Sequence, residues 1–175
     1  DLGYSAAEKR VKDNEFVLAR PDISTVCLWH EHDSDSIFDT QFVIIREFRS
    51  PASTEDGFIR EFPSGSAIHN SNPLEVASTE LHEETGFYLQ PSRLKAHVSR
   101  QLMGTLSAHQ AHLFSAEIDD DELKWLKAQK DIAHGKEEDT ERTFIEIYSV
   151  KEILKNNLFD WSTLGQILQV LGDTY

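Results

Sequence analysis

Three glutamates within one short segment are the residues of this sequence best suited to chemistry. The segment 72–86 reads NPLEVASTELHEETG and contains Glu80, Glu83 and Glu84. On a helix these three side chains share one arc, and like-charged neighbours three or four positions apart cost roughly 0.2–0.5 kcal/mol each. A cation would remove that cost. Mg²⁺ binds a few carboxylate oxygens and completes its shell with water and substrate phosphate, so the pattern predicts a metal–diphosphate site, with Mn²⁺ as an alternative ion.

The residues around these glutamates indicate both ends of a helix. Asn72 is suited to cap its start, Pro73 to occupy its first position and Gly86 to end it. The alternative interpretation is an ordinary solvated acidic face, because charge runs usually face water. The well-capped helix, together with Gly65 upstream of it, favours the metal site.

The segment 65–87 resembles the Nudix box, the signature of the Nudix hydrolase superfamily. The family pattern is Gly, five residues, Glu, seven residues, then Arg-Glu-apolar-any-Glu-Glu-any-Gly-apolar. The matching positions are Gly65, Glu80, Leu81, Glu83, Glu84, Gly86 and Phe87. Ser71 stands where the family has Glu, and Thr79 where it has Arg. Those two family residues pair with each other, so the double change leaves no orphan charge.

Upstream of the box, the chain is most similar to the ADP-ribose pyrophosphatase branch of this family. The stretch VIIREFRSP resembles the branch's strand that ends in a substrate-holding basic residue, which maps to Arg49 and, as a second candidate, to Arg46. The stretch EFPSG resembles the segment that leads into the box. Glu61 is thereby a substrate-binding candidate and the backbone carbonyl of Ser64 a metal ligand. Alternatively, both arginines are exposed surface residues of a strand.

Downstream of the box, two further segments resemble parts of the same branch. GKEEDTERTFIEIYSVKEI is similar to the loop and strand that supply an additional catalytic carboxylate, for which Glu141 is the first candidate and Asp139 the second. A solvated acidic turn is the alternative. RQLMGTLSAHQAH stands in place of a substrate-contacting segment, so Gly104 and His109 are candidate substrate contacts.

The resemblance implies Mg²⁺-dependent hydrolysis of the diphosphate bond in a nucleoside diphosphate derivative, with ADP-ribose or a related nucleotide sugar as the expected substrate. The products would be AMP and a sugar phosphate. Glu80, Glu83, Glu84 and the Ser64 carbonyl would hold the metal. Glu83, Glu84 and Glu141 would be catalytic, with Glu141 or a box glutamate taking the proton of the attacking water.

A second hypothesis is a weakly active or inactive nucleotide-binding regulatory domain. It follows from Ser71 and Thr79, which remove the usual internal brace of the box. A purely structural acidic protein is a third hypothesis, which the spacing of the box disfavours. Relatives in this branch are commonly dimers, so a homodimer is also compatible with the resemblance.

The elements that must position these residues form an α/β domain of the α+β type, with a Nudix-like mixed β-sheet sandwiched between helices. We expect one domain over residues 1–175, in which 1–20 is a candidate N-terminal arm and Ser5–Asn14 a short polar helix or arm. The expected strands are Ser24–Trp29, Gln41–Phe48, Phe58–Phe62, Leu94–Leu102, Ala111–Ile118 and Thr143–Val150. The expected helices are Asn72–Gly86, Asp121–Lys130 and Trp161–Leu171. Trp125 and Trp161 are expected in the core.

Composition limits the class of partner. The 175 residues include 31 acidic and 17 basic side chains, a formal net charge of −14. This charge opposes binding to nucleic acid or anionic lipid, so a small-molecule nucleotide is the expected partner. The absence of a long apolar run and of an apolar signal sequence predicts a cytoplasmic protein without membrane association. Cys27, the sole cysteine, excludes an intramolecular disulfide and is expected to be buried.

Overall fold

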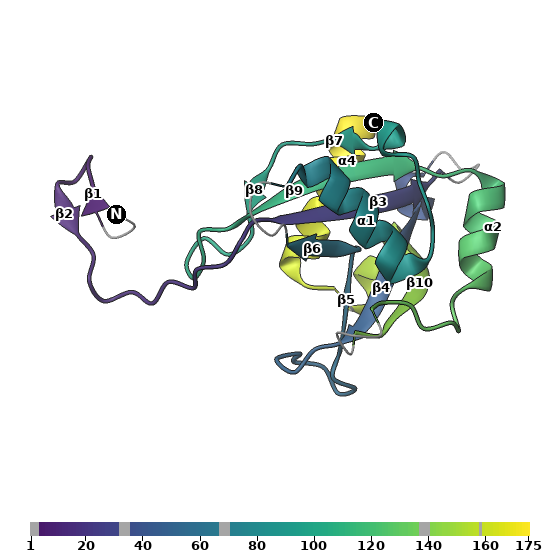
Figure 1. Cartoon of the computed structure of the whole chain (residues 1–175), viewed down its shortest axis with the longest axis horizontal. Helices are drawn as coiled ribbons and strands as arrows, with labels where there is room; N and C mark the ends of the chain where they lie inside the picture. Colours follow the sequence, from purple (N-terminus) through teal and green to yellow (C-terminus); the bar gives the residue numbers. More distant parts are fainter. Residues whose placement is uncertain (1–3, 32–35, 67–70, 137–140, 158) are drawn as a thin grey trace.

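The computed structural model describes residues 4–31, 36–66, 71–136, 141–157 and 159–175. Its body is an eight-stranded mixed sheet with helices on both faces, and the N-terminal segment extends away from that body (Figure 1). The expected α/β class with a mixed sheet is therefore confirmed.

The strands and helices have the following bounds. The strands are Tyr4–Ser5 (β1), Arg10–Val11 (β2), Ile23–His30 (β3), Gln41–Phe48 (β4), Phe58–Glu61 (β5), Ser64–Ser66 (β6), Lys95–Ala96 (β7), Arg100–Gln101 (β8), Gln110–Glu117 (β9) and Thr143–Ser149 (β10). The α-helices are Pro73–Thr85 (α1), Asp120–Ala128 (α2), Val150–Asn156 (α3) and Trp161–Thr174 (α4). Two 3₁₀ turns lie at Ile37–Asp39 (η1) and Pro91–Arg93 (η2).

The sheet has the order β10-β4-β3-β9-β7, to which β5, β6 and β8 are added as partners of β4, β3 and β9. Strand β3 runs parallel to β9 and antiparallel to β4 and β6. Because β3 lies inside the sheet and is covered on both faces, its residues 24–29 are buried without alternation, and Val26–Trp29 form an apolar run. Cys27 lies in this strand and is fully buried, as the sequence predicts.

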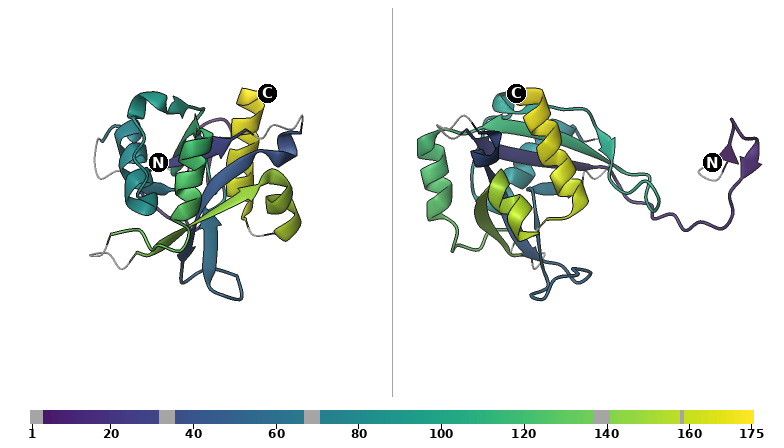
Figure 2. Two further views of the ribbon diagram at one scale, coloured as in Figure 1. Left: turned by 90° about the vertical axis from the view of Figure 1, so that its right-hand side faces the viewer. Right: turned by 180° about the vertical axis from the view of Figure 1, so that it is seen from behind.

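Two hydrophobic cores lie on opposite faces of the sheet. Alternation along each strand sends successive side chains to opposite faces, so Val43 joins the core under α1 while Phe42 joins the core under α3 and α4. Figure 2 shows α4 and α3 on the face turned away from α1. The sheet thereby separates two surfaces of different chemistry, one beside α1 and one beside α4.

Several expected elements differ from the structure. For Ser5–Asn14 the structure shows the arm and not the short helix, because β1 pairs with β2 in a small hairpin on an extended arm. The expected strand Leu94–Leu102 is divided into β7 and β8, which pair separately with β9. Helix α3 directly follows β10 and was not expected, since seven residues are too few for a clear helical pattern.

Two tryptophans expected in the core lie on the surface. Trp161 begins α4 and is 88% exposed, and Trp125 on α2 is 40% exposed while its ring packs against Phe87. Periodicity predicted their helices but not which side faces the sheet. Among the helices of the described residues, none has both the length and the apolar character needed to cross a membrane.

Candidate functional site

Helix α1 begins and ends where the sequence predicts. The Asn72 side chain accepts a hydrogen bond from the Leu74 backbone N–H at 3.0 Å, and Gly86 ends the helix with a φ of 67°. Ala77 and Leu81 are fully buried against the sheet. This anchored face fixes the rotation of the helix and turns its glutamates toward β6 and the neighbouring strands.

The carboxylate of Glu80 lies against the backbone of β6. A Cβ atom placed on Gly65 would be 2.1 Å from Oε1 of Glu80, so no larger residue fits there without moving that carboxylate. Burial raises the pKa of Glu80, the charges of Glu83 and Glu141 raise it further, and Lys136 opposes them. Gly65 and Glu80, fifteen positions apart in the sequence, are therefore direct neighbours.

Glu84 is the most deeply buried glutamate of the helix. It is 3% exposed, and its Oε2 accepts a hydrogen bond from the Ser64 backbone N–H at 2.8 Å. Burial raises the pKa of Glu84 well above its ordinary value; the Ser64 N–H opposes the shift, while the charges of Glu61, Glu80 and Glu47 add to it. A buried carboxylate with three acidic neighbours favours either a proton or a cation.

Strands β4 and β5 bring two more carboxylates to the same face. Glu61 pairs in register with Ile45, two residues before Glu47, so both glutamates project toward α1. The Arg49 Nη2 lies 2.8 Å from Oε2 of Glu47 and 3.5 Å from Oε1 of Glu61. Burial, offset by Arg49, raises the pKa of Glu47 to about 7. The predicted candidates Arg49 and Glu61 thus meet at the glutamate site.

Glu141 is also brought to this site. Its backbone oxygen lies close to Gly135, whose N–H donates to the carbonyl of Glu83, and its charge raises the pKa values of Glu47 and Glu80. The other candidate for the additional carboxylate, Asp139, lies outside the described residues. We define the glutamate site by six acidic residues: Glu47, Glu61, Glu80, Glu83, Glu84 and Glu141.

The structure separates Arg46 from this site. Successive side chains of β4 point to opposite faces, so Arg46 lies on the far side of the sheet from Glu47. There its Nε pairs with Oε1 of Glu146 at 2.9 Å, and its guanidinium lies 4.4 Å from the centre of the Phe58 ring and 4.9 Å from that of Phe144. Of the two predicted arginines, only Arg49 lies with the glutamates.

Gly104 and His109 lie near the base of the N-terminal arm. Gly104 is in the turn closed by the hydrogen bond from Leu106 N–H to the Met103 carbonyl. His109 is 5% exposed and its Nδ1 is 2.5 Å from the Ser107 hydroxyl. Burial, followed by the charge of Arg20, lowers the pKa of His109. Neither predicted residue has a described contact with the glutamate site.

Three functional candidates were not predicted from the sequence. Glu47 belongs to the inward face of β4, and alternation with Val43 could have revealed it. Arg20 donates to the Ser66 hydroxyl at 3.2 Å, and its charge lowers the pKa of Glu61. Lys136 pairs with Glu83. No local pattern marks the two basic residues, because only the folded chain brings them beside the acids.

The donor chemistry at the glutamate site fits a hard cation, because carboxylate oxygens are the ligands that Mg²⁺ takes from proteins. Glu84 already uses one oxygen on the Ser64 N–H, which fixes its direction. With the side chains as they stand, no three Asp, Glu, His or Cys groups of the described residues converge closely enough to hold one ion. Metal binding therefore requires a change of side-chain conformation, which the half-buried Glu80 and Glu83 can make most easily.

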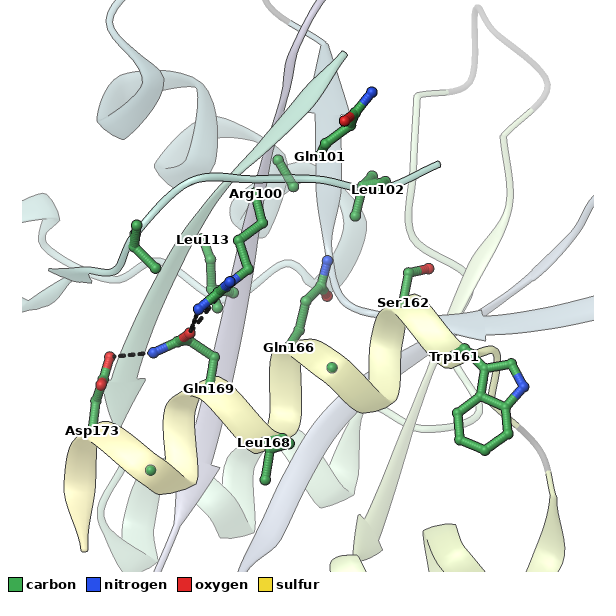
Figure 3. Close-up of a pocket in the computed structure, with 14 residues that line it drawn as sticks. Arg100, Gln101, Leu102, Leu113, Trp161, Ser162, Gln166, Leu168, Gln169 and Asp173 are labelled. Atoms are coloured by element: carbon green, nitrogen blue, oxygen red, sulfur yellow. Dashed lines mark hydrogen bonds between the residues drawn. The ribbon is translucent and has the colours of Figure 1, made fainter. Parts of the chain in front are cut away.

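A cavity lies on the other face of the sheet. It has a volume of about 590 Å³ between β8, β9 and α4, and its walls include Leu113, Leu168 and Trp161 (Figure 3). Gln169 links the groove's charged groups: it accepts from Arg100 at 3.1 Å and donates to Asp173 at 3.0 Å. We call this cavity the α4 groove. Because its polar groups pair with one another, a charged ligand would stabilise it less than it would stabilise the glutamate site.

Comparisons with known proteins add little to this geometry. No protein family profile and no curated protein matches the chain. One solved structure similar to it is the T. brucei MERS1-RNA complex, at 16% sequence identity and a TM-score of 0.47. The match covers 59% of this chain and 36% of the other, so it spans about a third of that protein's length. A likeness at this level carries no argument about activity or ligand.

Proposed function

We propose that this protein hydrolyses the diphosphate bond of a nucleoside diphosphate derivative in a Mg²⁺-dependent reaction, with ADP-ribose or a related nucleotide sugar as substrate. The observation that carries the proposal is that β6 meets the glutamates of α1: Gly65 lies against Glu80, and the Ser64 backbone N–H donates a hydrogen bond to Glu84. These contacts bring together residues that the sequence resemblance had selected separately.

Each acidic group has a distinct role in this proposal. Glu80, Glu83, Glu84 and the Ser64 carbonyl would hold the metal, whereas Glu141, whose charge acts on Glu47 and Glu80, would accept a proton from water. The water oxygen bonds to phosphorus as the bond to the bridging oxygen breaks, which yields AMP and a sugar phosphate. Bound Mg²⁺ supplies charge neutralisation of the diphosphate and of the leaving phosphate.

Two arginines support recognition of an anionic substrate. Arg49, the residue after β4, is 40% exposed and faces the glutamates, while Arg20 approaches the same site from the arm. Because a guanidinium can bind phosphate oxygens through two parallel N–H groups, either residue can orient a diphosphate in this otherwise acidic region. The charges of both arginines act on Glu61, because each lowers its otherwise raised pKa.

The direct test is the Mg²⁺-dependent release of AMP from ADP-ribose. Glu83→Gln and Glu84→Gln each remove one proposed metal ligand at nearly constant volume, and we expect turnover to fall by on the order of 10²-fold or more. Glu117→Gln, an exposed change at the end of β9, is the matched control. Unchanged turnover in both site variants would show that this site is not the catalytic one.

A binding domain without hydrolysis is the second candidate. It is favoured by Ser71 and Thr79 at the two positions of the family's internal brace, Thr79 being exposed on α1. A panel of nucleoside diphosphate sugars, dinucleotides, coenzyme A and capped RNA separates the two functions. Tight binding of one compound with no cleavage of any would favour the binding domain.

A further inference from the structure

The segment His134–Lys136 is tied to the last turn of α1. His134 and Thr143 exchange backbone hydrogen bonds at 2.9 and 3.0 Å, and the Gly135 N–H donates to the carbonyl of Glu83 at 2.9 Å. The Thr143 hydroxyl also donates to the carbonyl of Glu84 at 2.7 Å. These bonds satisfy carbonyl groups that a helix end would otherwise leave unpaired, so they hold the segment in place beside the glutamates.

Gly135 allows this close approach. Its φ is 106°, and a Cβ atom there would lie 2.6 Å from the backbone oxygen of Glu141. The residue that follows, Lys136, directs its side chain back to α1 and places Nζ 2.8 Å from Oε2 of Glu83. Three backbone hydrogen bonds thus hold His134 and Gly135 in place, and they direct the Lys136 side chain toward Glu83.

Positive charge is unevenly distributed around the glutamate site. Arg49 faces Glu47 and Glu61, on the β4–β5 side. On the α1 side, Lys136 pairs with Glu83 and its charge also lowers the pKa of Glu80. The Lys136 ammonium therefore acts on two of the glutamates to which we assigned metal binding.

We propose that Lys136 is an internal counter-ion of the glutamate site, which neutralises Glu83 in the metal-free protein and must be displaced when a divalent cation binds. This inference rests on the proposed function, because it assumes that Glu80 and Glu83 are metal ligands. The ammonium and the metal compete for the same carboxylate and repel each other. Displacement is feasible because the Lys136 side chain is 47% exposed, so its charge can move into water.

Lys136 thereby sets the affinity of the glutamate site for the metal ion. With Lys136 on Glu83, the site is stable without metal but binds it more weakly. Once displaced, the ammonium moves from Glu83 toward the solvent, where it can contact an anionic substrate. The structure thus assigns to one lysine both the stability of the empty site and its affinity for metal.

The test measures Mn²⁺ binding by electron paramagnetic resonance in the full chain and in Lys136→Gln, with no nucleotide present. We expect affinity to rise about fivefold or more in Lys136→Gln, since two unit charges 4 Å apart in water interact by ~1 kcal/mol. Lys124→Gln, on the exposed side of α2, makes the same change in net charge and should leave affinity almost unchanged.

A second readout needs no metal. In the presence of a chelator, Lys136→Gln should unfold at a lower temperature than Lys124→Gln, and adding Glu83→Gln should remove most of that difference. Equal Mn²⁺ affinity in the parent and Lys136→Gln, or weaker binding in the variant, would overturn the displacement while leaving the metal site intact. No Mn²⁺ binding to either protein would overturn the metal site and the displacement together.

Discussion

The glutamate site and the α4 groove lie on opposite faces of one sheet. They differ in how far their polar and charged groups are paired. In the groove, Arg100, Gln169 and Asp173 bond to one another, and Asp173 also accepts from His97, whose other ring nitrogen is bonded to Ser115. At the glutamate site, six acids face the cations Arg20, Arg49 and Lys136, and burial raises several of the acids' pKa values.

The difference identifies which surface has more to gain from a ligand. A groove whose polar groups are paired loses hydrogen bonds when a ligand enters, unless the ligand replaces them. Buried carboxylates that repel one another are stabilised by any cation that reaches them. Charge balance, rather than the size of the cavity, is therefore the better guide to function in this protein.

The largest expected effect is that of a substitution at Gly65, in the glutamate site. Gly65→Ala places a Cβ atom 2.1 Å from Glu80 Oε1, so the carboxylate must move. We expect turnover to fall on the order of 10²-fold, because displacement of a catalytic group by about 1 Å costs that much. The unfolding free energy should change little, because the contact involves the end of a flexible, half-buried side chain that can move away. AMP release and urea unfolding measure the two quantities. Unchanged AMP release would show that turnover does not depend on this contact of Glu80.

The raised pKa values of the buried carboxylates should make the unfolding free energy depend on pH. The pKa of Glu47 is about 7 in the folded protein, so the group binds its proton more tightly there than when unfolded. Its contribution to stability is full below about pH 4.5 and is lost as the pH rises through 7. The raised pKa values of Glu61, Glu80 and Glu84 act in the same direction.

Glu47→Gln should remove this part of the pH dependence. At pH 8 without divalent cations, we expect the variant to exceed the parent in unfolding free energy by on the order of 1–3 kcal/mol. Denaturant unfolding at pH 5 and pH 8 checks this, with Glu55→Gln in an exposed loop as control. A parent protein that is more stable at pH 8 than at pH 5 would contradict the electrostatics described for the glutamate site.

The smallest expected effect lies in the α4 groove. Gly165 is inside α4, and no atom would lie within 4 Å of an added Cβ. Gly165→Ala should therefore raise the unfolding free energy by up to about 1 kcal/mol through helix propensity alone, and leave AMP release unchanged. A rise in melting temperature with full turnover would sharpen the contrast with Gly65→Ala. A loss of turnover would instead connect the groove to the reaction.

Local sequence was enough for the helix that carries the glutamates. Caps at Asn72 and Gly86 and an apolar face of Ala77 and Leu81 act over one or two turns, so the bounds of α1 could be predicted. Strands such as β4 followed from runs of β-branched and aromatic residues. The resemblance to the Nudix box singled out Gly65 and Glu80 by their spacing alone, and the structure brings the two residues into contact. The activity and the homodimer that the resemblance implies stay predictions.

Only the tertiary structure decided which charges share a surface. Arg46 and Arg49 look equivalent in the sequence, yet the pleat of β4 sends Arg46 to the far face while Arg49 reaches Glu61. Arg20 and Lys136 come to the site from an arm and a loop, where no periodicity constrains direction. Side-chain identity is a local property, whereas electrostatic partnership depends on distances across the fold. The sequence therefore determined the acidic helix, and the folded chain determined its counter-ions.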